Sequence, residues 1–286
     1  MRLKRLVYGL STICRIRELG YFIPYRYAAG ADREALDYPW IKQLFSVNKK
    51  RSFIETLEKL TPYTEDLKKI KRHSSDPDEP RWGQDWFPGL DAAVAYGLVR
   101  ARKPKQIIEL GSGHSTRFLL RAIADGGLDT AVTCVDPAPR AVLPEQELEL
   151  IKQPVQTVPL EKLPKLMAGD ILLIDSSHIA MPGSDVDWVI NNILPSLPKG
   201  ALVHFHDIFL PDPYPAEWRW REYNEQISIS ALMAGGRVTP FFSSHFVRKY
   251  LSESVVKLGF DWIPLELNSF ETSLWTEIAG NEFYKN

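Results

Sequence analysis

The sequence is poor in cysteine and contains no long apolar run. Its two cysteines, Cys14 and Cys134, lie far apart in 286 residues, so they suggest neither a disulfide framework nor a metal-binding CxxC pair. No stretch approaches the roughly 20 apolar residues that a membrane-spanning helix needs. The basic N-terminal stretch lacks a small-residue cleavage site, which argues against a signal peptide. We therefore expect a reducing compartment and predict a cytoplasmic protein.

The net charge of −1 hides a strong asymmetry along the chain. Residues 1–72 contain 16 lysines and arginines against 8 acidic residues, whereas the remainder contains 19 against 28. An acidic body repels a polyanion, which argues against nucleic acid as a ligand.

The basic N-terminal segment has the pattern of an amphipathic helix over residues 3–14. Leu3, Leu6, Val7 and Leu10 recur at helical spacing between arginines and a lysine. One interpretation is that residues 1–20 contact the inner face of an anionic membrane. The other is that this arm docks on its own domain or on a second subunit of a homo-oligomer.

Two further helical pieces are expected over residues 40–72, with a break near Thr61-Pro62. The following HSSDPDEPRWGQDWFPG has three prolines, two glycines and no period, which predicts a loop. We place a boundary near residue 80. Residues 1–80 would form a basic helical extension and residues 81–286 a cofactor-binding domain.

Apolar runs alternate with helical patterns after this boundary, as in a doubly wound α/β domain with a parallel sheet. Ser115 and Ser184 are placed to cap two of the helices. Strands are predicted at 106–110, 131–136, 154–158, 170–175 and 201–207, and helices at 115–124, from about 140, at 184–194 and at 216–233.

Polar residues follow the predicted strands at the points where they end. Ligands of such sheets bind outside the carboxyl ends of the strands, so these residues should share one pocket. They are Glu109 to His114, Asp136, Asp175 to His178, and His206 with Asp207.

The segment ELGSGHS lacks the third glycine of GxGxxG and the lysine of a phosphate-binding loop. A carboxylate at Glu109 would repel the pyrophosphate of a dinucleotide. S-adenosylmethionine (SAM) carries a sulfonium and an ammonium, which favour acidic surroundings, and Asp136 is placed to bind its ribose diol.

ELGSGHST, followed by VD after the next strand, resembles the class I SAM-dependent methyltransferases. WFPGLDAAVAYGLVR, DILLIDSSH, GSDV and LVHFHDIFLPDPYPAEW resemble more specifically a bacterial group associated with surface glycans. The resemblance spans roughly residues 80–280 and implies a mostly parallel, seven-stranded Rossmann-like sheet closed by antiparallel strands near Phe241-Phe242 and TSLWTEI. The cofactor-binding residues that it implies are Glu109, Gly111, Ser112, Gly113, Asp136 and Asp175. We add His114 and Ser115, which belong to the same loop.

His178, His206 and Asp207 are the predicted catalytic residues, because an alcohol acceptor must lose a proton and histidine is the natural base near neutral pH. His204, in mid-strand, is expected in the core, and Ser176 and Ser177 are expected to turn the chain. A metal-dependent alternative places Mg, Mn or Zn on Asp175, His206 and Asp207, by analogy with O-methyltransferases that hold a divalent cation there.

The expected acceptor is a sugar or another small hydroxylated molecule, with walls formed by Trp86, Phe87 and Tyr214. The sequence thus predicts a SAM-dependent methyltransferase that modifies a polysaccharide or its precursor. Two other functions stay open: a nicotinamide-dependent oxidoreductase on a similar sheet, and a scaffold that binds the cofactor without turnover.

Overall fold

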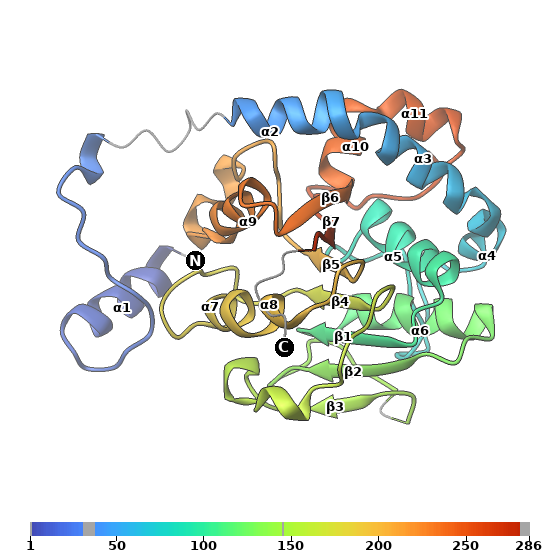
Figure 1. Ribbon diagram of the computed structural model, residues 1–286. Helices are drawn as coiled ribbons and strands as arrows, with labels where there is room; N and C mark the ends of the chain where they lie inside the picture. The colour runs from blue at the N-terminus through green and yellow to red at the C-terminus, as the bar shows by residue number, and fades with distance from the viewer. Residues whose placement is uncertain (1, 31–37, 145, 281–286) are drawn as a thin grey trace.

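Continuous apolar runs form a seven-stranded sheet in the order β3-β2-β1-β4-β5-β7-β6 (Figure 1). The computed structural model describes residues 2–30, 38–144 and 146–280. The strands are β1 Gln106–Leu110, β2 Ala131–Val135, β3 Glu149–Ile151, β4 Ile171–Ile174, β5 Leu202–Phe205, β6 Val238–Ser243 and β7 Leu274–Ile278.

Strands β1 to β5 are parallel, and β7 runs antiparallel to both β5 and β6. The predicted doubly wound, mostly parallel sheet with antiparallel closure is therefore confirmed. The order reverses at β1, which pairs with β2 on one side and with β4 on the other. Such a switch point opens a crevice at the carboxyl ends of the strands, and this crevice positions the site described below.

Helices flank the sheet and share one hydrophobic core with it. Helices α5 and α6 pack against one another, and α3 packs against α5 and β6 (Figure 1). The α-helices are α1 Arg2–Ile13, α2 Pro39–Gln43, α3 Lys50–Leu60, α4 Thr64–Lys68, α5 Gly89–Arg102, α6 His114–Gly126, α7 Asp185–Trp188, α8 Leu194–Ser196, α9 Glu225–Ala234, α10 Ser244–Tyr250 and α11 Ser252–Lys257. Shorter 3-10 or π turns are η1 Ala28–Gly30, η2 Leu44–Lys49, η3 Thr61–Tyr63, η4 Val155–Thr157, η5 Leu160–Lys162, η6 Val189–Ile193 and η7 Ala216–Arg221.

The helices between residues 39 and 68 join the core of the sheet domain. The ring of Phe53 meets Phe45, Phe242 and Phe246 edge to face at 5.6 to 6.1 Å. The predicted break at Thr61-Pro62 is present as η3, between α3 and α4. The boundary near residue 80 stays a prediction, although α3 and the sheet bury apolar surface together.

Several predicted elements differ from the structure. No helix forms between β2 and β3 among the described residues there, and residues 154–158 contain η4 rather than a strand. The predicted helix over 216–233 is divided into η7 and α9, because Glu222 takes a left-handed backbone with φ of 55°. Ser184 caps α7 as predicted, accepting from the Asp187 amide. Ser115 is no cap, since its hydroxyl donates to Glu109.

Helix α1 lies apart from the sheet (Figure 1) and leaves most of its apolar side chains in solvent. Leu3 is 74% exposed, and Ile16, just beyond the helix, is 79% exposed. An ion pair between Arg5 and Glu222 links the arm to the loop after η7. Within the described ranges, no helix has the length and apolar character needed to span a bilayer.

Gly111 ends β1 where the backbone after β4 comes very close. A Cβ at this position would lie 1.8 Å from the Asp175 carbonyl oxygen, and the φ of 79° disfavours any other residue. At Gly113, two residues later, the nearest contact of an added Cβ is 4.0 Å away, at Ala141. Of the two glycines of ELGSG, a close backbone approach therefore requires only Gly111.

We predict that Gly111→Ala lowers the free energy of unfolding by about 3 kcal/mol or more, because the new methyl group must displace backbone. Gly113→Ala, the matched control, should cost less than about 1 kcal/mol. Urea unfolding followed by circular dichroism measures both. Equal losses for the two variants would show that the contact with Asp175 does not constrain the loop.

Candidate functional site

The predicted strand ends converge on one cavity at the carboxyl edge of the sheet. Its volume is about 620 Å³. Residues that follow four neighbouring strands line it, namely Gly111 and Ser112 after β1, Asp136 after β2, Asp175 to His178 after β4, and His206 with Asp207 after β5. This is the geometry expected of a ligand site at a switch point.

Asp136 holds the glycine loop in place. Its Oδ2 accepts from the Ser112 amide at 2.7 Å and from the Ser112 hydroxyl at 3.1 Å, and its Oδ1 accepts from the Ala138 amide at 2.8 Å. Oδ2 thus accepts twice, whereas Oδ1 keeps a second lone pair with which it can accept from a ligand hydroxyl in the cavity. The predicted position of Asp136 beside the ligand is consistent with this geometry.

Glu109 does not face the cavity. It is 1% exposed, and its carboxyl group accepts from the hydroxyls of Ser115 and Thr116, each at 2.5 Å. Burial raises the pKa of Glu109 to about 7, against the effect of these hydrogen bonds. Glu109 therefore links the end of β1 to the first turn of α6 through hydrogen bonds. The predicted contact with a cofactor is not supported.

Three other predicted cofactor residues, Gly113, His114 and Ser115, also lie outside the cavity lining. They form the start of α6, where the Gly113 amide donates to the Thr116 hydroxyl. Burial, together with the charges of Arg117 and Arg81, lowers the pKa of His114 to about 4, so this imidazole is neutral at pH 7. It belongs to the packing of the helix start.

His178 lies between three carboxylates and is 2% exposed. Its Nδ1 is 2.9 Å from Glu225 Oε2, and its Nε2 is 3.3 Å from Asp175 Oδ1 and 3.4 Å from Asp207 Oδ2. The amides of Asn224 and Glu225 donate to the His178 carbonyl, so the start of α9 fixes this loop. Both His178 and Asp207 have a positive φ, of 61° and 54°, which is an uncommon backbone that clusters at functional sites.

The charges of this cluster favour an imidazolium. Burial alone would lower the pKa of His178, but the hydrogen bonds with Asp175 and Glu225 and the charge of Asp207 raise it well above its ordinary value. Burial also opposes ionisation of Asp175, yet the imidazoles of His206 and His178 hold its pKa below the ordinary range. Burial raises the pKa of Glu225, against the hydrogen bond from His178.

His206 is anchored more firmly than a free base would be. Its Nε2 lies 2.9 Å from the carbonyl oxygen of Trp86, and its Nδ1 lies 3.4 Å from the Thr272 hydroxyl. A carbonyl only accepts, so Nε2 carries a proton. Of the two predicted histidine bases, the geometry favours His178, whose Nε2 faces two carboxylates that line the cavity.

A family model described as a methyltransferase domain matches residues 108–208, which include the ends of β1, β2, β4 and β5. These residues are similar to a methyltransferase domain. The prediction of a methyltransferase is confirmed by this match. No curated protein matches the chain.

Solved structures that are similar to this chain include three methyltransferases. The methyltransferase PaMTH1 from Podospora anserina, solved with bound S-adenosylhomocysteine (SAH), is 14% identical in sequence, with a TM-score of 0.43. The match covers 92% of this chain and 100% of the PaMTH1 chain. An O-methyltransferase from Bacillus cereus in complex with SAH is 12% identical, with a TM-score of 0.42. The match covers 87% of this chain and 100% of the other. The O-methyltransferase TomG from Streptomyces achromogenes, in complex with SAM, is 14% identical, with a TM-score of 0.40. The match covers 79% of this chain and 90% of the TomG chain.

The residues of this methyltransferase do not fit the predicted divalent metal. Within residues 2–30, 38–144 and 146–280, no three His, Cys, Asp or Glu side chains are arranged to hold an ion. Of the predicted ligands, His206 directs its Nε2 proton at Trp86, and the space between Asp175 and Asp207 faces the positive His178. An imidazolium there takes the place that a cation would need.

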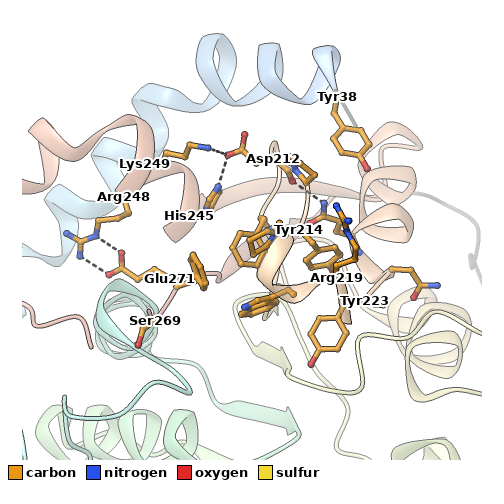
Figure 2. A pocket seen from close by; sticks show the side chains of 18 of the residues that line it. Tyr38, Asp212, Tyr214, Arg219, Tyr223, His245, Arg248, Lys249, Ser269 and Glu271 are labelled. Atoms are coloured by element: carbon orange, nitrogen blue, oxygen red, sulfur yellow. Dashed lines mark hydrogen bonds and ion pairs between the residues drawn. The ribbon is translucent and has the colours of Figure 1, made fainter. Parts of the chain in front are cut away.

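The predicted substrate walls fall in three different places. Trp86 lines the methyltransferase cavity, and the Arg140 guanidinium lies 4.6 Å above its ring. Phe87 is wrong as a wall residue, since it is 2% exposed and packs edge to face on His204 and His206. Tyr214 lines a second, adjoining cavity (Figure 2).

His204 and Ser177 have the structural roles expected of them. His204 is 1% exposed and its Nε2 is 2.7 Å from the Ser273 hydroxyl. Ser177 donates through its amide and its hydroxyl to Asp185, which turns the chain toward α7.

Sequence analysis missed Arg221 and Tyr223 of the segment after β5. Tyr223 lies 4.6 Å from the His178 ring, and Arg221 Nη1 is 3.1 Å from the Tyr223 hydroxyl and 3.5 Å from Asp207 Oδ2. The dense aromatic and basic composition of WRWREY was the available signal, but it gives no direction for these side chains.

We predict that His178→Gln lowers the free energy of unfolding by about 3 kcal/mol at pH 6, because it leaves buried carboxylates without their counter-charge. The folded-state pKa of His178 is raised, so its stabilising effect is complete below the unfolded pKa of about 6.5 and is lost as pH rises through the folded value. The difference between wild type and variant should shrink in alkaline solution. Urea unfolding between pH 6 and 10 measures it.

His204→Gln is the matched control. Burial, with the charge of His206, lowers the pKa of His204 well below its ordinary value, so the neutral form is the folded one. The stabilising effect of His204 is present above about pH 6.5 and falls as the solution becomes more acidic. This pH trend is opposite to the one expected for His178. The same pH trend for both variants would contradict a charged His178.

Proposed function

We propose that this chain transfers the methyl group of SAM to a hydroxyl oxygen of a sugar or similar small acceptor. The observation that carries the proposal is the single cavity in which Asp136 of the second strand end meets the His178 and carboxylate cluster. When bound, SAM supplies a methyl carbon whose bond to sulfur breaks, with the electron pair left on sulfur, as the acceptor oxygen attacks.

The charge of the cavity supports SAM over a dinucleotide. Asp136, Asp175 and Asp207 line it, and these carboxylates disfavour a pyrophosphate but suit a sulfonium and an ammonium. Glu109 does not contribute to this preference, because its side chain lies outside the cavity lining. Asp136 would accept from a hydroxyl of the ribose diol through the remaining lone pair of Oδ1, and Gly111 lets the backbone approach the ligand closely.

His178 serves as the general base in this proposal. A positive sulfonium in the cavity gives Asp175 and Asp207 a second counter-charge, which favours loss of the His178 proton. The neutral imidazole keeps its Nδ1 proton on Glu225, so Nε2 presents a lone pair at the cavity. It can then take the proton of the acceptor hydroxyl, while Glu225 holds the ring in this orientation.

The test is isothermal titration with SAM, with its product S-adenosylhomocysteine (SAH), and with NAD, in two buffers of different ionisation enthalpy. SAM and SAH differ in one positive charge. We expect binding of SAM near pH 7.5 to release up to about one proton more than binding of SAH. His178→Gln should abolish this difference, and Asp136→Ala should weaken both ligands at least about tenfold.

The outcomes separate the alternatives. Binding of NAD without SAM would support the nicotinamide-dependent oxidoreductase and refute the methyltransferase. Equal proton release with both ligands would leave SAM binding intact and refute His178 as the base. Cofactor binding with no methylated product from any hydroxylated acceptor would support the non-catalytic scaffold.

For the N-terminal arm, we propose that residues 2–27 bind the surface of an anionic membrane. Residues 2–30 contain six arginines or lysines against the single acid Glu18. The exposed apolar side chains include aromatic ones beyond α1, with Phe22 64% exposed and Tyr27 64% exposed. Basic charge combined with an exposed apolar and aromatic face suits the interface of an anionic bilayer.

Vesicle sedimentation tests the arm. We expect the full chain to bind vesicles containing phosphatidylglycerol, and to bind pure phosphatidylcholine at least about tenfold more weakly. Leu6→Asp with Leu10→Asp should abolish binding to both, since charge then enters the apolar face. Unchanged partitioning of the variant would refute the proposal, and a dimer that dissociates on removal of residues 1–20 would assign the face to a second copy instead.

A further inference from the structure

A second cavity adjoins the first and is larger, with a volume of about 910 Å³ (Figure 2). The segment after β5, the start of α9, α10 and the segment before β7 form it. Trp218, Tyr223, Ser269 and Phe270 line both cavities. A ligand in the second cavity would therefore be one layer of side chains from the proposed methyl donor.

Aromatic rings make up much of the wall. Phe209 is the centre, with its ring 5.0 Å from Trp218, 5.6 Å from Phe270 and 5.9 Å from Tyr214. These edge-to-face contacts hold the rings in fixed orientations, so flat apolar faces are presented to a ligand without further ordering. Tyr38, which precedes α2, completes the rim from a distant part of the sequence (Figure 2).

The charged side chains at the far end of the cavity are paired with one another. Asp212 accepts from His245 Nε2 at 2.7 Å, from Lys249 Nζ at 3.0 Å and from the Tyr250 hydroxyl at 2.8 Å (Figure 2). Burial opposes it, but these partners hold the pKa of Asp212 below its ordinary range. His245 and Lys249 thus share Asp212, so an anionic ligand would have to compete with this buried carboxylate for them.

Another cation of the cavity wall, Arg248 of α10, is also paired with a carboxylate. Arg248 donates two hydrogen bonds to Glu271, one of them at 2.7 Å, and Glu271 also accepts from the Leu90 amide at 2.6 Å. Glu271 is 3% exposed and Arg248 serves as its counter-charge. Drawing this arginine toward a ligand would leave a buried carboxylate unpaired, which costs several kcal/mol.

The wall shared by the two cavities contains a hydroxyl without a partner. Ser269 Oγ is buried and forms no hydrogen bond within the part of the chain that the structure describes. Tyr223, on the same wall, stands 4.6 Å from the His178 ring. A ligand hydroxyl at this wall would meet a free hydrogen-bonding group and lie near the proposed base.

We propose that the second cavity is the acceptor site and that it selects an uncharged pyranoside over its anionic counterpart. Apolar ring faces would stack on the aromatic wall, and one hydroxyl would pass the shared wall toward His178. Its proton would go to His178 Nε2 and its oxygen would bond to the methyl carbon. This inference rests on the proposed methyltransferase function, but it adds the place and the charge of the acceptor.

The first arm of the experiment uses matched ligands on the SAH-loaded protein. The p-nitrophenyl glucoside, galactoside and rhamnoside are neutral, whereas the p-nitrophenyl glucuronide differs from the glucoside in bearing a carboxylate. Saturation-transfer NMR gives their affinities, and catechol, which is neutral at pH 7.5, tests a plain phenol. We expect at least one neutral glycoside to bind about tenfold or more tightly than the glucuronide.

The second arm uses matched variants. Ile227 and Val256 are both 59% exposed, and only Ile227 lines the second cavity. Ile227→Trp should narrow the cavity and weaken glycoside binding at least about tenfold, with SAH affinity within about twofold of wild type. Val256→Trp should change neither affinity. Because both positions face solvent, neither variant should disturb the fold.

The proposal would be overturned by glycoside binding that Ile227→Trp does not affect, by tighter binding of the glucuronide, or by binding of catechol with no neutral glycoside bound. The absence of binding by every sugar and phenol would also refute it. These failures are distinct from failure of the proposed function, because SAH binding to the first cavity is measured in the same samples.

Discussion

The buried His178 holds together three separate parts of the fold. Asp175 follows β4, Asp207 follows β5 and Glu225 begins α9, so their carboxylates would repel one another without a cation among them. The imidazole meets this need with two nitrogens on opposite sides, and it thereby fixes which carboxylate lies inward and which lie at the cavity. Position and charge of the site depend on this one ring.

Much of the fold and part of the site could be predicted from the sequence. Strands buried on both faces are continuous apolar runs, so β1, β2, β4 and β5 are recognisable, and parallel strands bring their carboxyl ends to one edge. That reasoning was sufficient to bring Asp136, Asp175, His178 and Asp207 to a common cavity. It needed only the order of residues along each strand.

Directions of side chains could not be predicted in this way. A strand covered on both faces has no solvent side, so period-two reasoning does not say whether Glu109 faces a ligand or the hydroxyls of α6. Phe87 lies in a loop without periodicity. The charge of His178 depends on Glu225, which is 47 residues away along the chain, and sequence separation carries no information about this distance.

Tyr38 has a consequence for how such a chain can diversify. It stands before the sheet domain in the sequence, yet it forms part of the rim of a cavity built otherwise from loops that follow β5 and precede β7. The strand ends that meet the first cavity come from a different set of segments. A graft of the sheet domain without the segment before it would thus carry the first cavity whole into a new host, while the second cavity would lose part of its rim.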